Sequence, residues 1–160
     1  MDFMSPDLSK YKLIDKQFKK VHCHYTILKR LGSGSFGVVY KINSKLNGKL
    51  FALKKVDLSK RKNMIGFREP ANLSFINDLL TALNKQKLYH DSWTEEGYMF
   101  IKMKLFEGNI TDLYGKCKFV DRNVFFDLCL QLISFTSLIH KNGYVHLDIK
   151  PGRFKREHTV

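Results

Sequence analysis

The fold is decided by the stretch Leu31-Gly-Ser-Gly-Ser-Phe-Gly-Val-Val-Tyr-Lys41, which places three glycines in a short run and then becomes β-branched. The glycines are Gly32, Gly34 and Gly37. Glycine lets a backbone approach phosphate groups closely, because it has no side chain and tolerates positive φ. A dinucleotide-binding fingerprint would open a helix directly after such glycines. Here Val38 and Val39 continue as a strand, so the stretch predicts a glycine hairpin that covers the phosphates of a nucleotide.

Two further motifs follow the glycine hairpin along the chain. Lys54 ends the run Phe-Ala-Leu-Lys and would reach the α- and β-phosphates, while its neighbour Lys55 would face the other side of the strand as a surface lysine. Asp148 and Lys150 lie in the run His-Leu-Asp-Ile-Lys-Pro. Asp148 would accept the proton of a substrate hydroxyl, and Lys150 would neutralise the transferring phosphoryl group. The order of the three motifs predicts transfer of the γ-phosphoryl group of ATP.

Side chains around the glycines complete the predicted ATP pocket. Val39 and Ala52 are placed to sandwich an adenine ring. Phe36 would cap the tip of the hairpin, and Leu31 directly precedes the first glycine. These four side chains are therefore expected to contact ATP together with the glycines and Lys54.

Hydrophobic periodicity predicts an α+β fold with five strands and one helix inserted after the third strand. The strands are expected at 25–31, 37–43, 50–56, 88–93 and 98–105, and the helix at 72–84. Pro70 suits the first turn of that helix. Asn47-Gly48 is a hairpin signal between the second and third strands.

A longer helix is expected at 122–140, with Asp121 as its N-cap and Gly143 as its C-terminal stop. It is apolar over most of its circumference, so it should be buried on several sides. Without partners, about five or six large apolar side chains would stay wet, a lost stabilisation on the order of 10 kcal/mol. We therefore expect self-association through this helix. No apolar run approaches the length that would span a bilayer.

Residues 30–54 and 140–151 resemble eukaryotic protein kinases, and most closely the Wee/Myt inhibitory kinases of the cell cycle. The resemblance is carried by Gly-Ser-Gly-Ser-Phe-Gly, by His-Leu-Asp-Ile-Lys-Pro in place of the commoner His-Arg-Asp, and by Trp93-Thr-Glu-Glu-Gly. It implies a kinase small lobe, a five-stranded antiparallel sheet plus one helix, followed by the first, incomplete part of the helical large lobe. A kinase of the translation-initiation-factor type is disfavoured by Leu147 and by the lack of a long small-lobe insert.

The resemblance also implies residue roles, cofactors and partners. Met103 falls at the gatekeeper position, and Leu105 and Phe106 fall in the hinge that hydrogen-bonds adenine. The implied cofactors are ATP and Mg²⁺. The implied substrate is a protein, with a cyclin-dependent kinase as the family's target, and the implied location is intracellular, in the nucleus or the cytoplasm.

Four segments are expected along the chain. They are a basic extension at 1–22, the small lobe at 23–104, the hinge, long helix and catalytic loop at 105–152, and a tail unlike kinases at 153–160. The extension could form a short amphipathic helix clamped on the domain or remain a frayed basic tail. The residues 22–24 read as a strand, so Cys23 would face away from both neighbouring histidines and no metal site is expected there.

The magnesium ligands of the family are missing from the sequence. Arg153 stands where the family has a metal-binding asparagine, and a guanidinium offers no lone pair to a cation. The Asp-Phe-Gly segment that supplies the other ligand does not occur. The sequence therefore predicts a chain truncated after the catalytic loop and inactive by itself. The alternative to an enzyme is a catalytically dead pseudokinase or a nucleotide-binding interaction fragment.

Two acids are candidates for the ion pair that kinases form with the strand lysine. Glu69 is placed at the helix start by Pro70, and Asp78 lies in the middle of the helix but has a short side chain. Counting back from Trp93 puts Leu73 where the family has its glutamate. The sequence therefore does not predict a firm ion pair.

The composition sets broad limits on partners. The 160 residues carry a formal net charge of +13, which we attribute to lysines spread over solvated faces, so no specific nucleic-acid partner is expected. The three cysteines are far apart and form no CxxC pair, which indicates neither a disulfide framework nor a zinc site.

Overall fold

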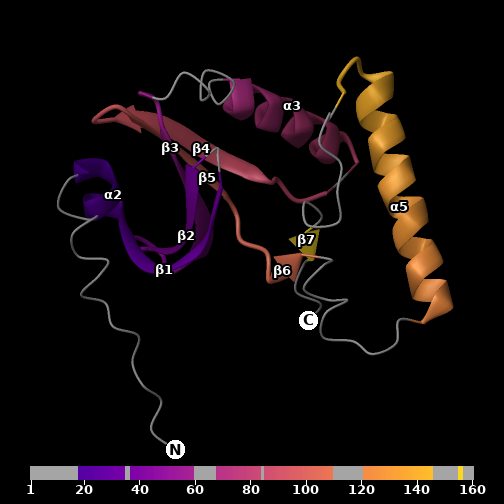
Figure 1. The fold of residues 1–160 in the computed structure, drawn as a ribbon, viewed down its shortest axis with the longest axis horizontal. Helices are drawn as coiled ribbons and strands as arrows, with labels where there is room; N and C mark the ends of the chain where they lie inside the picture. Colours follow the sequence, from indigo (N-terminus) through magenta and orange to yellow (C-terminus); the bar gives the residue numbers. More distant parts are fainter. Residues whose placement is uncertain are drawn as a thin grey trace, which may run out of the picture. The chain divides into compact units, whose positions relative to one another are not determined.

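Figure 1 shows the fold of the computed structural model, which describes residues 18–34, 37–59, 68–83, 85–109, 121–145 and 155–156. The chain divides into two compact units, Met1–Leu105 and Phe106–Val160. Among the described residues, the first unit contains a β-sheet and two helices, and the second contains a long helix and a short pair of strands.

The first unit is built on an antiparallel sheet of five strands. They are β1 (Tyr25–Gly34), β2 (Gly37–Ser44), β3 (Leu50–Asp57), β4 (Tyr89–Glu95) and β5 (Tyr98–Lys104). Their order in the sheet is β1-β2-β3-β5-β4, so β1 and β4 are the edge strands. The helix α3 (Glu69–Ala82) lies between β3 and β4 in the chain. The predicted α+β architecture of a small lobe is therefore confirmed.

Two of the strand connections depend on positive φ. The turn between β4 and β5 places Glu96 at φ 49° and Gly97 at φ 76°, as a two-residue hairpin requires. Between β2 and β3, the nitrogen of Ser44 donates to the Lys49 oxygen at 2.9 Å, and Gly48 has φ 67°. The predicted hairpin therefore forms, but its loop is longer than two residues.

The two faces of the sheet bury different side chains, because successive strand residues point to opposite sides. One face has a largely aromatic core, which consists of Phe18, Val21, Tyr25, Ile27, Tyr40, Ile42, Leu53 and Phe100. The other face packs Val56, Met99 and Ile101 against Leu58, Leu73, Tyr89 and Met103. Since Leu73 belongs to α3, we call the second side the α3 face and the first the aromatic face.

The helix α2 (Lys19–His24) packs against the aromatic face. Phe18 and Val21 are each only 1% exposed. The Phe18 ring meets Tyr98 and Phe100 edge-on, with centroid distances of 5.4 and 5.1 Å. Of the two alternatives for the extension, this part is a helix clamped on the domain. The boundary expected after residue 22 falls within this helix.

The prediction of an extended conformation for residues 22–24 was wrong. They were expected to be extended, yet they form the last turn of α2. Strand alternation therefore does not separate Cys23 from its neighbours. The part of the chain that the structure describes contains no cluster of three or more His, Cys, Asp or Glu side chains able to hold a metal.

The second unit contains α5 (Arg122–Lys141) and the paired strands β6 (Gly108–Asn109) and β7 (Lys155–Arg156). The Asp121 carboxylate accepts hydrogen bonds from the backbone nitrogens of Asn123 at 2.8 Å and Val124 at 3.3 Å. Gly143 follows the helix with φ 81°. Both ends of the predicted helix, the N-cap and the glycine stop, are confirmed.

α5 is much less buried than its apolar sequence predicted. Ile139 is the buried residue of this helix, while Leu130 and Ile133 are 63% and 66% exposed. The helix is also long and apolar enough to cross a membrane by length and composition alone, which corrects the view that no segment approaches that length. The core helix of a soluble protein can pass the same test, so this is weak support for a membrane span.

Candidate active site

An ion pair between β3 and α3 organises the site. The Nζ atom of Lys54 lies 2.7 Å from Oε1 and 2.6 Å from Oε2 of Glu69. The side chain of Lys54 is 14% exposed and that of Glu69 is 30% exposed, so solvent reaches only part of the pair. Charge-assisted hydrogen bonds of this kind are stronger than neutral ones. The pair therefore holds the lysine ammonium at one place beside the sheet.

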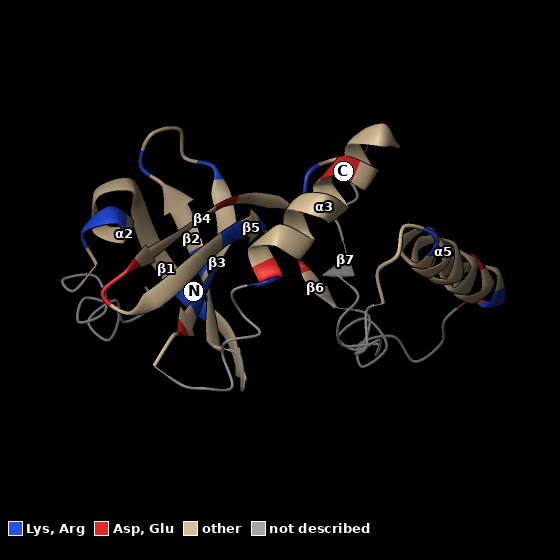
Figure 2. Ribbon diagram, turned by 90° about the horizontal axis from the view of Figure 1, so that it is seen from above, with Lys and Arg blue, Asp and Glu red and all other residues tan. Residues whose placement is uncertain are grey.

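The partner of Lys54 is Glu69 and not Asp78, and the sequence had not predicted a firm pair. Glu69 is the first residue of α3, which begins earlier than the expected position 72 and is coloured red at its start in Figure 2. A carboxylate in the first turn is favoured by the helix dipole, and Pro70 there loses no intrahelical hydrogen bond. Leu73, at the register expected for the acid, instead packs on the α3-face core. The helix start thus supplies the acid that pairs with Lys54, and Asp78 in the middle of the helix does not.

The glycine hairpin joins β1 to β2, where Gly34 pairs with Gly37. Gly37 has φ 124°, and a Cβ atom at this position would collide with the carbonyl oxygen of Lys55 on β3. Packing within the sheet therefore requires glycine there. A Cβ atom at Gly32 or Gly34 would meet no atom within 4 Å. Packing among the described residues therefore does not require glycine at these two positions, and their approach to phosphates stays a prediction.

Four of the predicted ATP contacts lie on one face of the sheet. Val39 pairs with Lys54 between β2 and β3, and Ala52 pairs with Met103 between β3 and β5. Directly opposed residues share a face, and so do residues two apart on a strand. Val39, Ala52, Lys54 and Met103 are therefore neighbours on the α3 face.

The remaining predicted residues are distributed as follows. Leu31 lies at an irregularity in the β1–β2 register and is 43% exposed. Leu105 follows β5 and is partly buried, and Phe106 begins the second unit. Outside the described residues lie Phe36, Asp148, Lys150 and Arg153.

Lys55 serves the opposite face of the sheet, as its place next to Lys54 predicted. Its Nζ atom lies 4.3 Å from the ring centroid of Phe18 and 4.0 Å from that of Tyr98. Burial lowers the pKa of Lys55, and the nearby Asp57 carboxylate acts in the opposite direction. Lys55 is therefore not a plain surface lysine, because it is a cation–π partner of the segment that leads into α2.

Asn77 is a positioning residue that the sequence analysis missed. It is 7% exposed in the middle of α3. Its Oδ1 atom accepts hydrogen bonds from the nitrogens of Leu88 at 2.8 Å and Tyr89 at 3.0 Å, and its Nδ2 atom donates to the Tyr89 oxygen at 2.6 Å. These bonds tie α3, and with it Glu69, to the start of β4. A single asparagine at a helical core position was the only signal in the sequence.

The chain matches the family model for the protein kinase domain over residues 25–153. The chain belongs to the protein kinase family. Its five-stranded sheet with one inserted helix agrees with the small lobe of that family, and the following helix agrees with the start of the large lobe.

Several curated kinases are similar to this kinase chain. A probable protein kinase of Dictyostelium discoideum is 36% identical over 126 residues, which cover 76% of this chain and 12% of the relative. The probable serine/threonine-protein kinase zyg-1 of Caenorhabditis elegans is 30% identical over 129 residues, or 80% of this chain and 17% of the relative. The Wee1-like protein kinase 1-A of Xenopus laevis is 28% identical over 133 residues, or 78% of this chain and 23% of the relative. The kinase chain therefore spans less than a quarter of the length of each of these three relatives.

The family uses ATP and Mg²⁺, and the described residues fit ATP better than Mg²⁺. The α3 face offers a fixed ammonium at Lys54 and two glycines with free space above them, a donor set suited to a nucleotide triphosphate. Among the described residues no carboxylate cluster could hold Mg²⁺. Glu69, the acid nearest to Lys54, is engaged by that lysine.

Proposed function

We propose that this chain is the ATP-binding part of a protein kinase that transfers the γ-phosphoryl group of ATP to a protein hydroxyl. The observation that carries the proposal is the ion pair of Lys54 with both oxygens of Glu69, at 2.6 and 2.7 Å, on a sheet with the glycine hairpin. The ammonium of an isolated lysine on a strand would extend into solvent without a fixed position. A lysine held by a carboxylate presents its charge at a fixed place, where the α- and β-phosphates of ATP can meet it.

Each residue has a distinct role in this proposal. Lys54 binds the α- and β-phosphates, and Glu69 keeps its ammonium in place. The hairpin glycines allow backbone N–H groups to approach the phosphates. Asp148 orients the substrate hydroxyl and accepts its proton, while Lys150 neutralises charge on the phosphoryl group. Mg²⁺, when bound, would offset negative charge on the phosphates, but the described residues include no acidic cluster to hold it.

Nucleotide binding by the full chain tests the role of the ion pair. We expect Lys54→Met to weaken the affinity for a fluorescent ATP analogue roughly tenfold or more, because charge-assisted hydrogen bonds contribute about 1.5–3 kcal/mol. Glu69→Gln should weaken it less, since the ammonium remains but is no longer fixed. The matched control is Lys55→Met, which removes the neighbouring ammonium from the other face and should change the affinity less than about twofold. Equal binding by Lys54→Met and the unmodified chain would contradict the proposal.

Phosphoryl transfer is tested separately from binding. In a kinase that joins this chain to a segment with the Mg²⁺ ligands, we expect radiolabelled γ-phosphate to appear on a protein acceptor, and Asp148→Asn to abolish that transfer while leaving nucleotide affinity unchanged. A transfer signal that persists in Asp148→Asn would come from another source and would contradict the assignment of the catalytic residue.

We further propose that the kinase is of the Wee/Myt inhibitory type and acts on a cyclin-dependent kinase inside the cell. Support comes from the His-Leu-Asp-Ile-Lys-Pro motif and from the Wee1-like relative at 28% identity. A probable serine/threonine-protein kinase and a probable protein kinase whose name gives no type are similar at 30% and 36% identity, so substrate choice needs a direct assay. We expect the full-length protein to phosphorylate a cyclin-dependent kinase, and a substrate altered at its own glycine loop to lose the signal.

A second candidate function is nucleotide binding without transfer. It is favoured by one observation, Arg153 at the position of a metal-binding asparagine. A guanidinium cannot ligate Mg²⁺ and would repel it. In this case Lys54→Met lowers nucleotide affinity, but neither the unmodified chain nor Arg153→Asn transfers phosphate.

A further inference from the structure

Residues 18–24, which we call the docked segment, consist of Phe18 and α2 and rest on the aromatic face of the sheet. Phe18 and Val21 are each 1% exposed, and both belong to the same core as Leu53 on β3 and Phe100 on β5. The Phe18 ring meets the Phe100 ring edge-on at a centroid distance of 5.1 Å. The docked segment therefore packs on the core that covers β3 and β5.

The strand register places this core directly behind the predicted nucleotide contacts. Lys54 pairs with Val39 on β2 and with Ile101 on β5, and this row of three residues lies on the α3 face. Successive residues of a strand point to opposite faces, so the rows on either side of it point to the aromatic face. These two rows contain Leu53 and Phe100. Lys54 therefore lies on backbone that the docked segment supports from behind.

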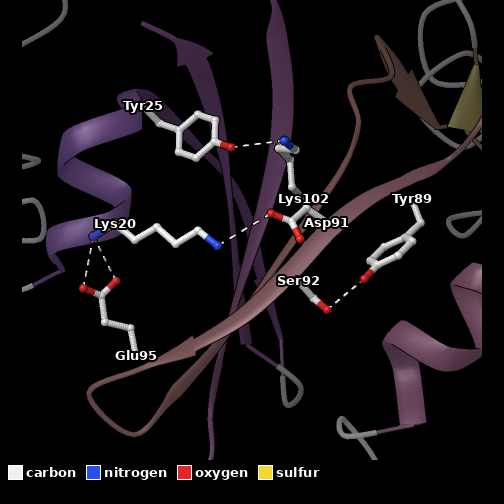
Figure 3. A network of polar contacts seen from close by, with 7 residues as sticks. All are labelled: Lys20, Tyr25, Tyr89, Asp91, Ser92, Glu95 and Lys102. Atoms are coloured by element: carbon white, nitrogen blue, oxygen red, sulfur yellow. Dashed lines mark hydrogen bonds and ion pairs between the residues drawn. The ribbon is translucent and has the colours of Figure 1, made fainter. Parts of the chain in front are cut away.

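The docked segment has two physically distinct states, because a helix of 6 residues is not stable by itself in water. In the docked state the backbone nitrogen of His22 donates to the Phe18 oxygen at 2.9 Å. The backbone nitrogen of Lys20 donates to the Glu95 carboxylate at 3.1 and 3.3 Å, and the ammonium of Lys20 lies 3.7 Å from the Asp91 carboxylate (Figure 3). Undocking would break these contacts together with the helix, so the amide of His22 reports the docked state.

The glycine hairpin is connected to the same part of β3. Lys55 pairs with Phe100, the residue whose ring the Phe18 ring contacts. Gly37, at the start of β2, lies so close to β3 that a Cβ atom at this position would collide with the Lys55 carbonyl oxygen. Because these backbones are in contact, order in β3 extends to the glycine hairpin.

Docking of the segment and binding of a nucleotide would restrict the same strands. A protein that one contact has already ordered loses less conformational entropy when it makes a second contact, so two such contacts favour each other. The docked segment restricts β3 and β5 from the aromatic face. A nucleotide held by Lys54 would restrict β3 from the α3 face. The expected coupling between the two is therefore positive in sign.

We propose that the docked segment is a built-in activator of nucleotide binding: ATP binds more tightly while residues 18–24 are docked on the aromatic face, and bound ATP strengthens the docking by the same factor. The proposal rests on the nucleotide site proposed above, and it does not depend on phosphoryl transfer. It assigns the segment a function besides the stability that its buried side chains contribute.

The affinity of the full chain for a fluorescent ATP analogue gives the first test. We expect Phe18→Ala to release the segment and to weaken the affinity about fivefold or more, the lower end of typical couplings between two sites. The matched control is Phe126→Ala, which removes the same side chain at a position on α5 that is 51% exposed. It should change the affinity less than about twofold, because surface substitutions usually have small effects. Both variants are measured below the unfolding transition that Trp93 fluorescence reports, and an unchanged affinity in Phe18→Ala would overturn the proposal.

Amide hydrogen exchange of the unmodified chain gives a second test, which decides the question even if Phe18→Ala fails to fold. Because coupling is reciprocal, saturation with a non-hydrolysable ATP analogue should slow exchange of the His22 amide about fivefold or more. The reference is the amide of Phe125 on α5, which donates to the Asp121 oxygen at 3.0 Å. A segment that only stabilises the sheet would show unchanged exchange at His22. Either that result or an equal slowing at His22 and Phe125, which would indicate unspecific binding, would overturn the proposal.

The two tests separate this proposal from the proposed nucleotide site. Failure of the unmodified chain to bind the ATP analogue, or equal binding by Lys54→Met, would overturn both. Binding that depends on Lys54, together with unchanged affinity in Phe18→Ala and unchanged exchange at His22, would overturn the coupling alone and leave the nucleotide site in place.

Discussion

The helices α2 and α5 show opposite relations between length and burial. α2 has 6 residues, yet Val21 and the preceding Phe18 are each 1% exposed. α5 has 20 residues, and Leu130 and Ile133 remain more than 60% exposed. A helix of six residues has no stability of its own in water, so α2 exists because the aromatic face receives it. Apolar composition therefore does not decide burial, because a complementary face must also be available.

Polar contacts reinforce the docking of α2. The backbone nitrogen of Lys20 donates to the Glu95 carboxylate at 3.1 and 3.3 Å, which satisfies an N–H group at the helix start that has no intrahelical acceptor (Figure 3). The ammonium of the same lysine lies 4.5 Å from the Trp93 ring centroid. The β4 strand thus supplies to α2 the capping that the short helix cannot provide by itself.

Phe18→Ala should give the largest effect in this comparison. Removing a fully buried phenylalanine costs about 3–5 kcal/mol of unfolding free energy, and the remaining α2 segment should detach. The measurement is urea unfolding followed by the fluorescence of Trp93, the single tryptophan of the chain, whose ring stacks on Tyr25 and Phe100.

The matched control is Phe126→Ala on α5, where the same side chain is 51% exposed. We expect it to leave the Trp93 transition within about 0.5 kcal/mol, as is typical of surface substitutions. Equal losses in the two variants would mean that α2 and α5 do not differ in burial in solution.

Asn77→Ala should follow with a loss of about 1–3 kcal/mol, because the nitrogens of Leu88 and Tyr89 and the oxygen of Tyr89 lose a buried partner. Hydrogen exchange should report this loss at the start of β4 and along α3. Thr81→Val serves as the control on the same helix, since the Thr81 hydroxyl only donates back to the Asn77 oxygen. A smaller loss for Asn77→Ala than for Thr81→Val would contradict the positioning role.

Much of the fold follows from sequence signals that are local. The strands around Gly32 to Lys54, the hairpin at Asn47-Gly48 and both ends of α5 depend on residues close in the chain, and they form as predicted. The docking of Phe18 depends on Tyr98 and Phe100, which lie far away in sequence. No local pattern carries that pairing, so the extension could be read equally well as helix or tail.

The candidate site also combines features that the sequence predicts with features that it does not. Val39, Ala52 and Lys54 share a face because strand alternation places them there, and alternation is visible in the sequence. The partner of Lys54 was not visible, because the count of residues back from Trp93 assumes a fixed helix register. In the structure α3 starts earlier than expected and brings Glu69 to the lysine, while Asn77 fixes α3 on β4.

Ile133→Glu tests whether the exposed side of α5 causes self-association. Ile133 is 66% exposed, so a charge there should not disturb folding but should prevent apolar contact between copies. We expect sedimentation velocity to show self-association of the unmodified chain and at least a tenfold weakening in Ile133→Glu, which corresponds to about 1.4 kcal/mol. Ser134→Glu adds the same charge at the next exposed position without removing an apolar group, and it should weaken association less. An unmodified chain that stays monomeric at high concentration would contradict this prediction.

Asp121→Ala should give the smallest effect. It should show how much the N-cap contributes to α5 independently of side-chain packing. The Asp121 carboxylate caps α5 by accepting from the nitrogens of Asn123 and Val124, and loss of such a cap costs about 0.5–2 kcal/mol. Since α5 buries little, we expect the loss to appear as reduced helical circular dichroism and faster amide exchange in the first turn. The Trp93 transition should not move, because the sheet does not depend on this cap. Asp121→Asn, which keeps a capping oxygen, should restore most of the helical signal, and a variant that fails to do so would show that the charge and not the cap stabilises α5.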